Sequence, residues 1–238
     1  MWPVILFATW PERLSRANFH AEFREEVAPA NFGLCDQSGT EALAHMVQMV
    51  TGMDAQATVT CIDGVGAFDH VLRASIFRQL LAHEHLRELV PYVRAWYGAV
   101  SEYVWVDDDG LQHTVAQGEG GEQGDALMPA LFSVALKPAL SAIQARLGPG
   151  ELVVAYLDDI YLITAPENAR RAYDITAEVL RQMCGIEVNQ GKLVCWSRSG
   201  GAAPPGISAL DTADHTVWRG VAGSVGGSGI VVVSPSRG

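Results

Sequence analysis

The chain has 238 residues, of which 49% are hydrophobic and 18% are charged, so it can bury a sizeable core and is not intrinsically disordered. Its formal net charge of -11, from 16 basic and 27 acidic residues, argues against an extensive phosphate-binding surface. The four cysteines form no CxxC pair, which favours free thiols in a reducing compartment over a zinc site or a disulfide framework.

The first ten residues, MWPVILFATW, are apolar but too short to span a bilayer, and they lack the basic start of a secretory signal. We therefore expect an intracellular protein, in the nucleus or the cytoplasm, without a transmembrane segment.

Further along, Ser38 and Glu41 have the spacing of a helix capping box. The helix that they predict has one apolar face, formed by Leu43, Met46, Val47 and Val50.

A β-branched segment, ATVTCI, predicts a strand that ends just before Asp63. Asp69 is placed to cap the next helix, in which apolar residues recur at helical spacing: Leu72, Ile76 and Leu80. A carboxylate at the end of a central strand is a common catalytic position and an equally common turn residue. Taken alone, Asp63 is better explained as a turn residue.

The middle of the chain contains three motifs that resemble known sites only in part. His83-Glu84-His85 is not the HExxH pair of metalloproteases, and on a continuous helix the two histidines point apart, which favours a solvated helix face. The acidic run VDDDG is better explained as a hairpin turn between two strands than as a calcium loop. The glycine-rich segment from Gly118 either lets the backbone approach a substrate closely or forms a flexible loop. A helix follows from Leu127, and Pro138 should kink or shorten it.

Two short buried strands flank Asp158 and Asp159 in LVVAYLDDIYLIT, so this pair falls in the connection of a tight hairpin. A bare Asp-Asp pair usually forms an ordinary polar turn. This turn lacks the glycine that two-residue hairpins favour, however, and two adjacent carboxylates repel each other unless a cation neutralises them. A divalent metal would serve as that cation.

The remaining elements complete a recognisable order. A helix from about Asn168 to Cys184 ends at Gly185, the strand LVCW follows, and the Gly-, Ser- and Pro-rich segment from about Ser199 is expected to be a mobile tail. Strand, helix, hairpin, helix and strand form the β-α-β-β-α-β order of a ferredoxin-like split, so we predict an α+β fold with an antiparallel sheet backed by helices.

Four segments lie in the order and at the distances found in one family: CIDGVGAFDHV, GEQGDALMPALF, YLDD and VNQGKL. Together they resemble the palm motifs of reverse transcriptases, nearest to those of non-LTR retrotransposons and group II introns. The similarity runs from about Asn31, which stands where the family has the glutamine of a Gln-Phe-Gly block, to Lys192. It implies a fingers-palm architecture, with a truncated fingers region at 1–52 and the catalytic palm at 53–198.

The resemblance also implies roles for individual residues. Asp63 and Asp158 would bind two magnesium ions, with manganese as an alternative, and Asp159 would support them. Lys192 would lie near the leaving pyrophosphate as a further catalytic group. The nucleotide contacts would be Phe68, Gln123, Gly124 and Tyr156, with the ring of Phe68 excluding a 2'-hydroxyl. The implied partners are an RNA template, a DNA primer and deoxynucleoside triphosphates, with no membrane.

Three departures from the family leave two functions open. Trp2 stands where the family has a phosphate-binding arginine. The piece Gly229–Gly238, within the tail at 199–238, resembles a degraded primer-grip strand, and no thumb follows it. The acidic balance is also unusual for a protein that holds a duplex. The first hypothesis is a reverse transcriptase domain of a retroelement. The alternative is an inactive fragment, or a maturase-like module that binds RNA without polymerising.

Overall fold

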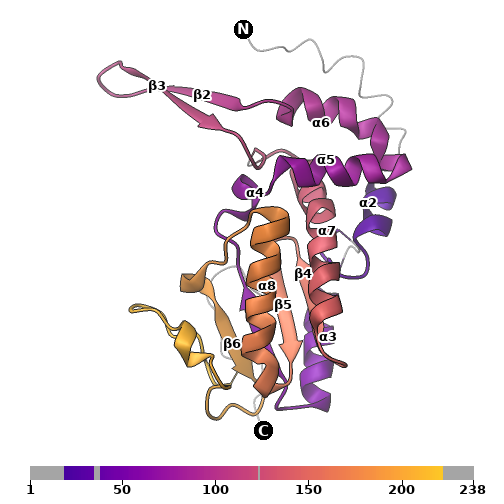
Figure 1. Ribbon diagram of the computed structural model, residues 1–238, viewed down its shortest axis with the longest axis vertical. Coiled ribbons are helices and arrows are strands. Elements are labelled where there is room, and N and C mark those ends of the chain that lie inside the picture. Colours follow the sequence, from indigo (N-terminus) through magenta and orange to yellow (C-terminus); the bar gives the residue numbers. More distant parts are fainter. Residues whose placement is uncertain (1–18, 35–37, 123, 222–238) are drawn as a thin grey trace.

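The computed structural model describes residues 19–34, 38–122 and 124–221, and a four-stranded antiparallel sheet lies at its centre (Figure 1). The strands are β1 (Thr58–Ile62), β4 (Leu152–Tyr156), β5 (Asp159–Thr164) and β6 (Val194–Ser197). They lie in the order β4-β5-β1-β6, with every neighbouring pair antiparallel. With α7 (Met128–Arg146) after β1 and α8 (Ala169–Cys184) after β5, the predicted β-α-β-β-α-β order is confirmed.

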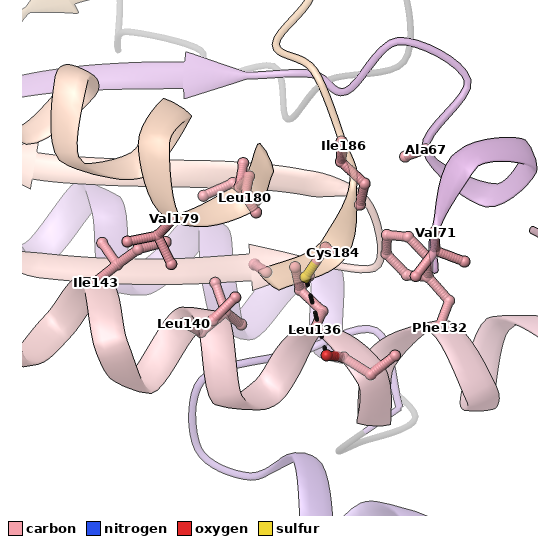
Figure 2. Packing of buried hydrophobic residues seen from close by; sticks show 14 of the residues in the cluster. Ala67, Val71, Phe132, Leu136, Leu140, Ile143, Val179, Leu180, Cys184 and Ile186 are labelled. Carbon is pink, nitrogen blue, oxygen red and sulfur yellow. Dashed lines mark hydrogen bonds between the residues drawn. The ribbon is translucent and has the colours of Figure 1, made fainter. Parts of the chain in front are cut away.

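Alternate residues of each strand face two different apolar clusters. On one face, residues such as Leu162 and Ala155 pack against α7 and α8 in the main core, part of which Figure 2 shows. On the other face, Tyr161 and Val154 pack with residues of α3 (Gly39–Met53). The predicted apolar face of α3 is confirmed, since Leu43 and Val47 are buried and Met46 and Val50 pack against the same cluster. The sheet is therefore covered on both faces, which explains its nearly continuous apolar strands.

The two long helices of the main core follow local signals in the sequence. Gly185 ends α8 in the left-handed conformation, with φ of 72°, as predicted for a helix C-terminus. Of the two effects predicted for Pro138, a kink or a shortened helix, the shortening is wrong, because α7 continues for eight residues beyond it to Arg146. By length and composition α7 could also cross a membrane, but its apolar residues are buried in the core, so the fold accounts for them.

A long insertion between β1 and α7 extends from one end of the sheet (Figure 1). It consists of α4 (Ala67–His70), α5 (Arg73–Ala82), the 3-10 helix η2 (Glu84–Leu89), α6 (Val90–Tyr97) and the hairpin of β2 (Ser101–Val106) and β3 (Gln112–Gln117). The acidic run forms the predicted hairpin turn, in which the Asp107 carboxylate accepts hydrogen bonds from the backbone N–H groups of Asp109 and Leu111. The prediction for Asp69 is wrong, since it lies inside α4 and Leu72 precedes α5.

Two further expectations differ from the structure near the ends of the described chain. Ser38 does occupy the N-cap of α3, but its side chain makes no capping hydrogen bond. The segment expected to be a mobile tail from Ser199 is packed as far as residue 221, because Ile207 and Val217 are fully buried and a short 3-10 helix, η5 (Ser208–Leu210), lies between them. The primer-grip-like piece Gly229–Gly238 and Trp2 lie outside the described residues.

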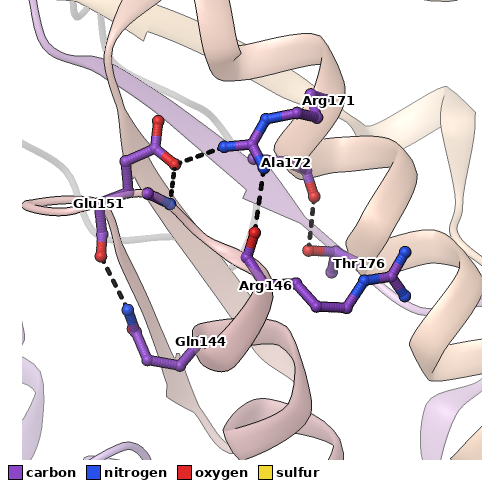
Figure 3. A network of polar contacts seen from close by, with 7 residues as sticks. Gln144, Arg146, Glu151, Arg171, Ala172 and Thr176 are labelled. Atoms are coloured by element: carbon purple, nitrogen blue, oxygen red, sulfur yellow. Dashed lines mark hydrogen bonds and ion pairs between the residues drawn. The ribbon is translucent and has the colours of Figure 1, made fainter.

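A buried carboxylate closes the connection between α7 and β4 (Figure 3). Glu151 Oε2 accepts hydrogen bonds from Gly148 N at 2.6 Å and from Arg171 Nη2 at 2.9 Å, and Arg171 Nη1 also donates to the carbonyl oxygen of Arg146 at 3.0 Å. The end of α7, the start of β4 and the first turn of α8 are thereby joined at one point. This connection sets where β4 enters the sheet, and so where the β4–β5 turn emerges.

Leu136→Ala tests whether the main core carries the stability of the fold. Leu136 is fully buried between α7 and α8, so the truncation should lower the free energy of unfolding by about 2–5 kcal/mol. Urea denaturation followed by circular dichroism measures this change. The matched control is Leu81→Ala on α5, where the side chain is 53% exposed and the loss should stay below about 0.5 kcal/mol.

Candidate active site

The three aspartates predicted as metal ligands lie at one end of the central sheet. Asp63 follows the last residue of β1, Asp158 lies in the two-residue turn between β4 and β5, and Asp159 is the first residue of β5. The expectation that both Asp158 and Asp159 belong to the connection is therefore corrected, because Asp159 pairs with Tyr156 in the sheet. Strand alternation puts Asp159 on the same face as Tyr161, away from α7 and α8.

Lys192 reaches this group of carboxylates from the loop before β6. Its Nζ lies 3.1 Å from Asp63 Oδ2, with the lysine side chain 62% exposed and that of Asp63 16% exposed. The loop is held in place by Asn189, whose N–H donates to the Asp63 carbonyl oxygen at 2.8 Å and whose Nδ2 donates to Asp63 Oδ2 at 3.4 Å. The fold thus brings Lys192 into contact with Asp63, which lies 129 residues earlier in the sequence.

The negative charges of the site are not fully compensated. Burial, followed by the nearby charges of Asp158 and Asp63, raises the pKa of Asp159 to about 6, although the charge of Lys192 opposes the rise. Burial likewise raises the pKa of Asp158, with the charge of Asp63 adding to the effect. One ammonium group faces three carboxylates, so the site would be stabilised by a further cation.

The donor set suits a hard divalent cation, since carboxylate oxygens are the ligands that Mg²⁺ and Mn²⁺ prefer. Asp63, Asp158 and Asp159 would hold such an ion. The carboxylate oxygens of these three aspartates do not all lie within 4.8 Å of one another, however. In the described part of the chain, the one group of three potential ligands whose ligand atoms all lie within 4.8 Å of one another is Glu26, His83 and His85.

The turn that carries Asp158 contains an unusual backbone conformation. Leu157 has a φ of 53°, in the left-handed region where glycine is usually found and where a branched side chain is strained. The buried side chain of Asn31 holds this residue from both sides. Its Oδ1 accepts the Leu157 N–H at 3.1 Å, and its Nδ2 donates to the Leu157 carbonyl oxygen at 3.3 Å. The missing glycine of the hairpin is therefore compensated by a side chain from 126 residues earlier.

The Asn-Phe-Gly segment as a whole is built around this turn. Phe32 N donates to the Ala155 carbonyl oxygen at 2.8 Å, which attaches the segment to the outer edge of β4. A Cβ at Gly33 would lie 2.7 Å from the side chain of Leu157, so only glycine allows this approach. Asn31 and Gly33 are the positioning residues that sequence reasoning missed. The signal was present in the resemblance of this block to Gln-Phe-Gly, but no role followed from it.

Phe68 and the glycine-rich segment lie together on the other side of the site. The ring of Phe68 is partly buried and its centroid is 4.6 Å from that of Phe132. Gly121 N donates to the Phe68 carbonyl oxygen at 3.0 Å, and a Cβ at Gly120 would lie 2.1 Å from the carbonyl oxygen of Asp69. Gly120 therefore permits a close approach to the backbone of Asp69, whereas the predicted approach of these glycines to a substrate stays a prediction.

Of the other three predicted nucleotide contacts, the structure describes two. Gln123 lies outside the described residues. Gly124 has a φ of 97° and open space around the position that a Cβ would take. Tyr156 is partly buried against the cluster on the α3 face and pairs with Asp159 across the turn. The structure thus brings Tyr156 beside the aspartates.

Arg73 is a third residue that sequence reasoning missed. It is 6% exposed, its Nε donates to the Gly120 carbonyl oxygen at 2.9 Å, and its Nη1 donates to the Ala99 carbonyl oxygen at 2.6 Å. Its backbone N–H donates to Glu119 Oε2 at 2.6 Å. Arg73 therefore joins α5, the glycine-rich segment and the hairpin of β2 and β3. An arginine at the start of a helix that also contains Arg78 carries no sequence signal for such a role.

Asn31→Ala should destabilise the protein, because it leaves the N–H and the carbonyl oxygen of Leu157 without their partner. The expected loss is about 2–3 kcal/mol of unfolding free energy, measured by urea denaturation. Asn168→Ala is the matched control, since Asn168 stands at the N-cap of α8 and its side chain makes no capping hydrogen bond. Equal effects of the two substitutions would contradict the role given to Asn31.

Asp159→Asn should stabilise the metal-free protein at neutral pH. The pKa of Asp159 is about 6 in the folded chain and lower when unfolded, so the folded state binds the proton more tightly and stability falls as the pH rises between about 4 and 6. Asparagine carries no charge to bury. With EDTA present, we expect a gain of about 1 kcal/mol at pH 7.5, after allowing for solvent screening, that disappears near pH 4. Asp214→Asn, at an exposed position, should give no such pH-dependent gain.

Comparisons with known proteins agree with this geometry. Residues 13–213 match the family described as reverse transcriptase (RNA-dependent DNA polymerase). Among curated proteins, the chain is 27% identical over 137 residues to the retrotransposable element SLACS 132 kDa protein of Trypanosoma brucei gambiense. That alignment covers 58% of this chain and 11% of the relative, so the chain spans only a small part of that protein's length.

Solved structures of telomerase share the fold. Apo telomerase from Candida tropicalis, truncated from its C-terminal domain, has a TM-score of 0.59 at 12% identity, covering 82% of this chain and 43% of that one. The same enzyme in complex with a fragment of telomeric RNA has a TM-score of 0.54 at 10% identity, covering 82% and 38%. These likenesses concern the fold alone. The family match extends over most of the chain, and the chain therefore belongs to the reverse transcriptase (RNA-dependent DNA polymerase) family.

Proposed function

We propose that this chain is the polymerase domain of a retroelement, which transfers deoxynucleotides to the 3'-hydroxyl of a primer under the direction of an RNA template. The observation that carries the proposal is the convergence of Asp63, Asp158 and Asp159 with Lys192 at one end of the sheet. The similarity to a retrotransposon protein supports the choice of a retroelement. An intracellular site, in the nucleus or the cytoplasm, fits such an element.

The aspartates would act as the metal-binding group of the reaction. When bound, two magnesium ions, or manganese, would activate the primer hydroxyl and neutralise the triphosphate charge. Asp63 and Asp158 supply the principal ligand oxygens. Asp159 lies beside them, and the burial and like charges that raise its pKa would also make a bound cation stabilising there. Asn31 would fix the turn so that the Asp158 carboxylate keeps its direction.

The other residues would bind and orient the nucleotide. Lys192, which forms an ion pair with Asp63, has an exposed flexible side chain that can instead donate to the leaving pyrophosphate. Phe68 is partly exposed and braced by Phe132, so its ring could exclude a 2'-hydroxyl. Gln123, Gly124 and Tyr156 would contact the incoming nucleotide or the template, with Gly124 offering an open approach.

The division of the chain remains part of the proposal. Residues 1–52 would contribute to the fingers and 53–198 would form the palm, with a tail at 199–238. The packing of α3 on the palm sheet supports a close association between these two parts. The burial of Ile207 and Val217 in the main core supports extending the palm to about residue 217.

A maturase-like RNA-binding module or an inactive fragment is the second candidate, and the charge balance favours it. With 16 basic residues against 27 acidic ones, few phosphate contacts are available to hold a primer and template. Binding by the isolated chain should therefore be weak and should depend only shallowly on salt concentration. The intact group of aspartates favours polymerisation, so primer extension separates the two functions.

In primer extension on an RNA template with Mg²⁺, the chain by itself should give weak extension, because it has few basic residues with which to hold the duplex. Asp158→Asn with Asp159→Asn should abolish it. The charge-matched control is Asp108→Asn with Asp109→Asn, in the exposed hairpin turn, which should retain activity. Complete absence of extension by the unaltered chain would favour the second candidate.

Mn²⁺ binding tests the metal site without a nucleic acid. Electron paramagnetic resonance of free Mn²⁺ should show binding by the unaltered chain, and Asp158→Asn with Asp159→Asn should weaken it by at least about 100-fold because most of the ligand charge is lost. The control pair at Asp108 and Asp109 should bind normally. Undiminished binding by the first variant, with a circular dichroism spectrum like that of the unaltered chain, would rule out these aspartates as the ligands.

A further inference from the structure

A second cluster of potential metal ligands lies where α2 (Phe19–Val27) meets the junction of α5 and η2. Glu26 Oε1 lies 2.9 Å from His83 Nδ1 and 3.2 Å from His85 Nε2. The ligand atoms of these three residues all lie within 4.8 Å of one another. The expectation of two histidines on a solvated helix face is therefore wrong.

The reason is a change of backbone conformation at His83. The helix α5 ends at Ala82, and His83 has φ of -103° and ψ of 116°, an extended conformation, before the 3-10 helix η2 begins. A residue spacing of two on a continuous helix separates the side chains by about 200°, but the break at His83 removes that constraint. Both imidazoles can then face the same carboxylate oxygen.

From this cluster we propose a metal site for a divalent transition-metal ion, Zn²⁺ above all, with Glu26 Oε1, His83 Nδ1 and His85 Nε2 as its three protein ligands. Two imidazole nitrogens and one carboxylate oxygen are ligands that zinc accepts. Ligand atoms about 2.0–2.2 Å from a tetrahedral ion lie about 3.3–3.6 Å apart, so the separations of 2.9 and 3.2 Å from the glutamate oxygen need to widen only by a few tenths of an ångström to admit the ion. The ligand set differs from the carboxylates of the polymerase site, so the two sites select different metals.

The surroundings support the glutamate as a ligand. Its side chain is 12% exposed, and its second oxygen, Oε2, accepts a hydrogen bond from Lys137 Nζ of α7 at 3.2 Å. This contact orients the carboxylate and leaves Oε1 directed at the histidines, as outer partners of metal-binding carboxylates generally do. His85, at 37% exposure, lies at the solvent side, so a water molecule can take the fourth position.

The bound ion would brace the part of the protein that leads to the polymerase site. It would join α2 to the junction of α5 and η2, and Asn31 follows only four residues after the end of α2. Asn31 N donates to the Val27 carbonyl oxygen at 3.2 Å, so the end of α2 and the residue that holds the Leu157 turn are directly connected. The inference does not depend on polymerase activity.

The test uses the full chain carrying Asp158→Asn and Asp159→Asn, so that the aspartates do not contribute, after removal of metal with a chelator. Isothermal titration with Zn²⁺ should show one site, Co²⁺ should give the visible absorption bands of a four-coordinate ion, and Zn²⁺ should raise the melting temperature. His85→Gln and Glu26→Gln should each weaken Zn²⁺ binding by more than about 100-fold, since outer partners alone contribute about 10–100-fold.

His45→Gln is the matched control, because His45 is an exposed histidine on α3, and it should bind Zn²⁺ like the parent chain. If Glu26→Gln fails to fold, His85→Gln decides, since its side chain is partly exposed and tolerates substitution better. Absence of Zn²⁺ binding by the parent, or equal binding by the His85 and His45 variants, would overturn the proposal. The cluster would then be a hydrogen-bonded brace without metal.

Discussion

The arrangement of the active end depends on one interaction, the hold of the Asn31 carboxamide on both backbone groups of Leu157. Without glycine, the β4–β5 turn needs an external partner to keep Leu157 in the left-handed region. Asn31 is that partner, and it is buried, so water cannot replace its hydrogen bonds and losing them would be destabilising. Everything that the turn carries, including Asp158 and the first residue of β5, takes its position from this contact.

The same end of the sheet is electrostatically unfavourable in the absence of a cation. Burial and nearby carboxylate charges raise the pKa values of Asp158 and Asp159, and the charge of Lys192 opposes the rise at both. Such an arrangement reduces stability, and proteins retain it mainly where function requires it. The covered sheet and the Glu151 network provide the rigid support that this strained end needs.

Much of the fold was predictable because local signals agreed with one another. The apolar periodicity of α3 and α8, the glycine that ends α8 and the β-branched strands each indicated the element that formed. The errors arose where one local signal competed with packing. Pro138 does not end α7, because burial of the apolar residues on both sides of it outweighs one lost hydrogen bond. The segment after Ser199 is rich in glycine and proline, yet a few apolar side chains attach it to the core.

The sequence by itself determined the order of the elements, the family resemblance and the identity of the acidic residues, because these depend on periodicity and motif spacing along the chain. Only the tertiary structure decided which distant groups meet. Asn31 reaches Leu157, Lys192 reaches Asp63, and Glu26 reaches His83 and His85 because the antiparallel sheet and the insertion bring separate segments together. Such contacts depend on packing between elements and on single backbone breaks such as that at His83. Neither leaves a periodic signal in the sequence.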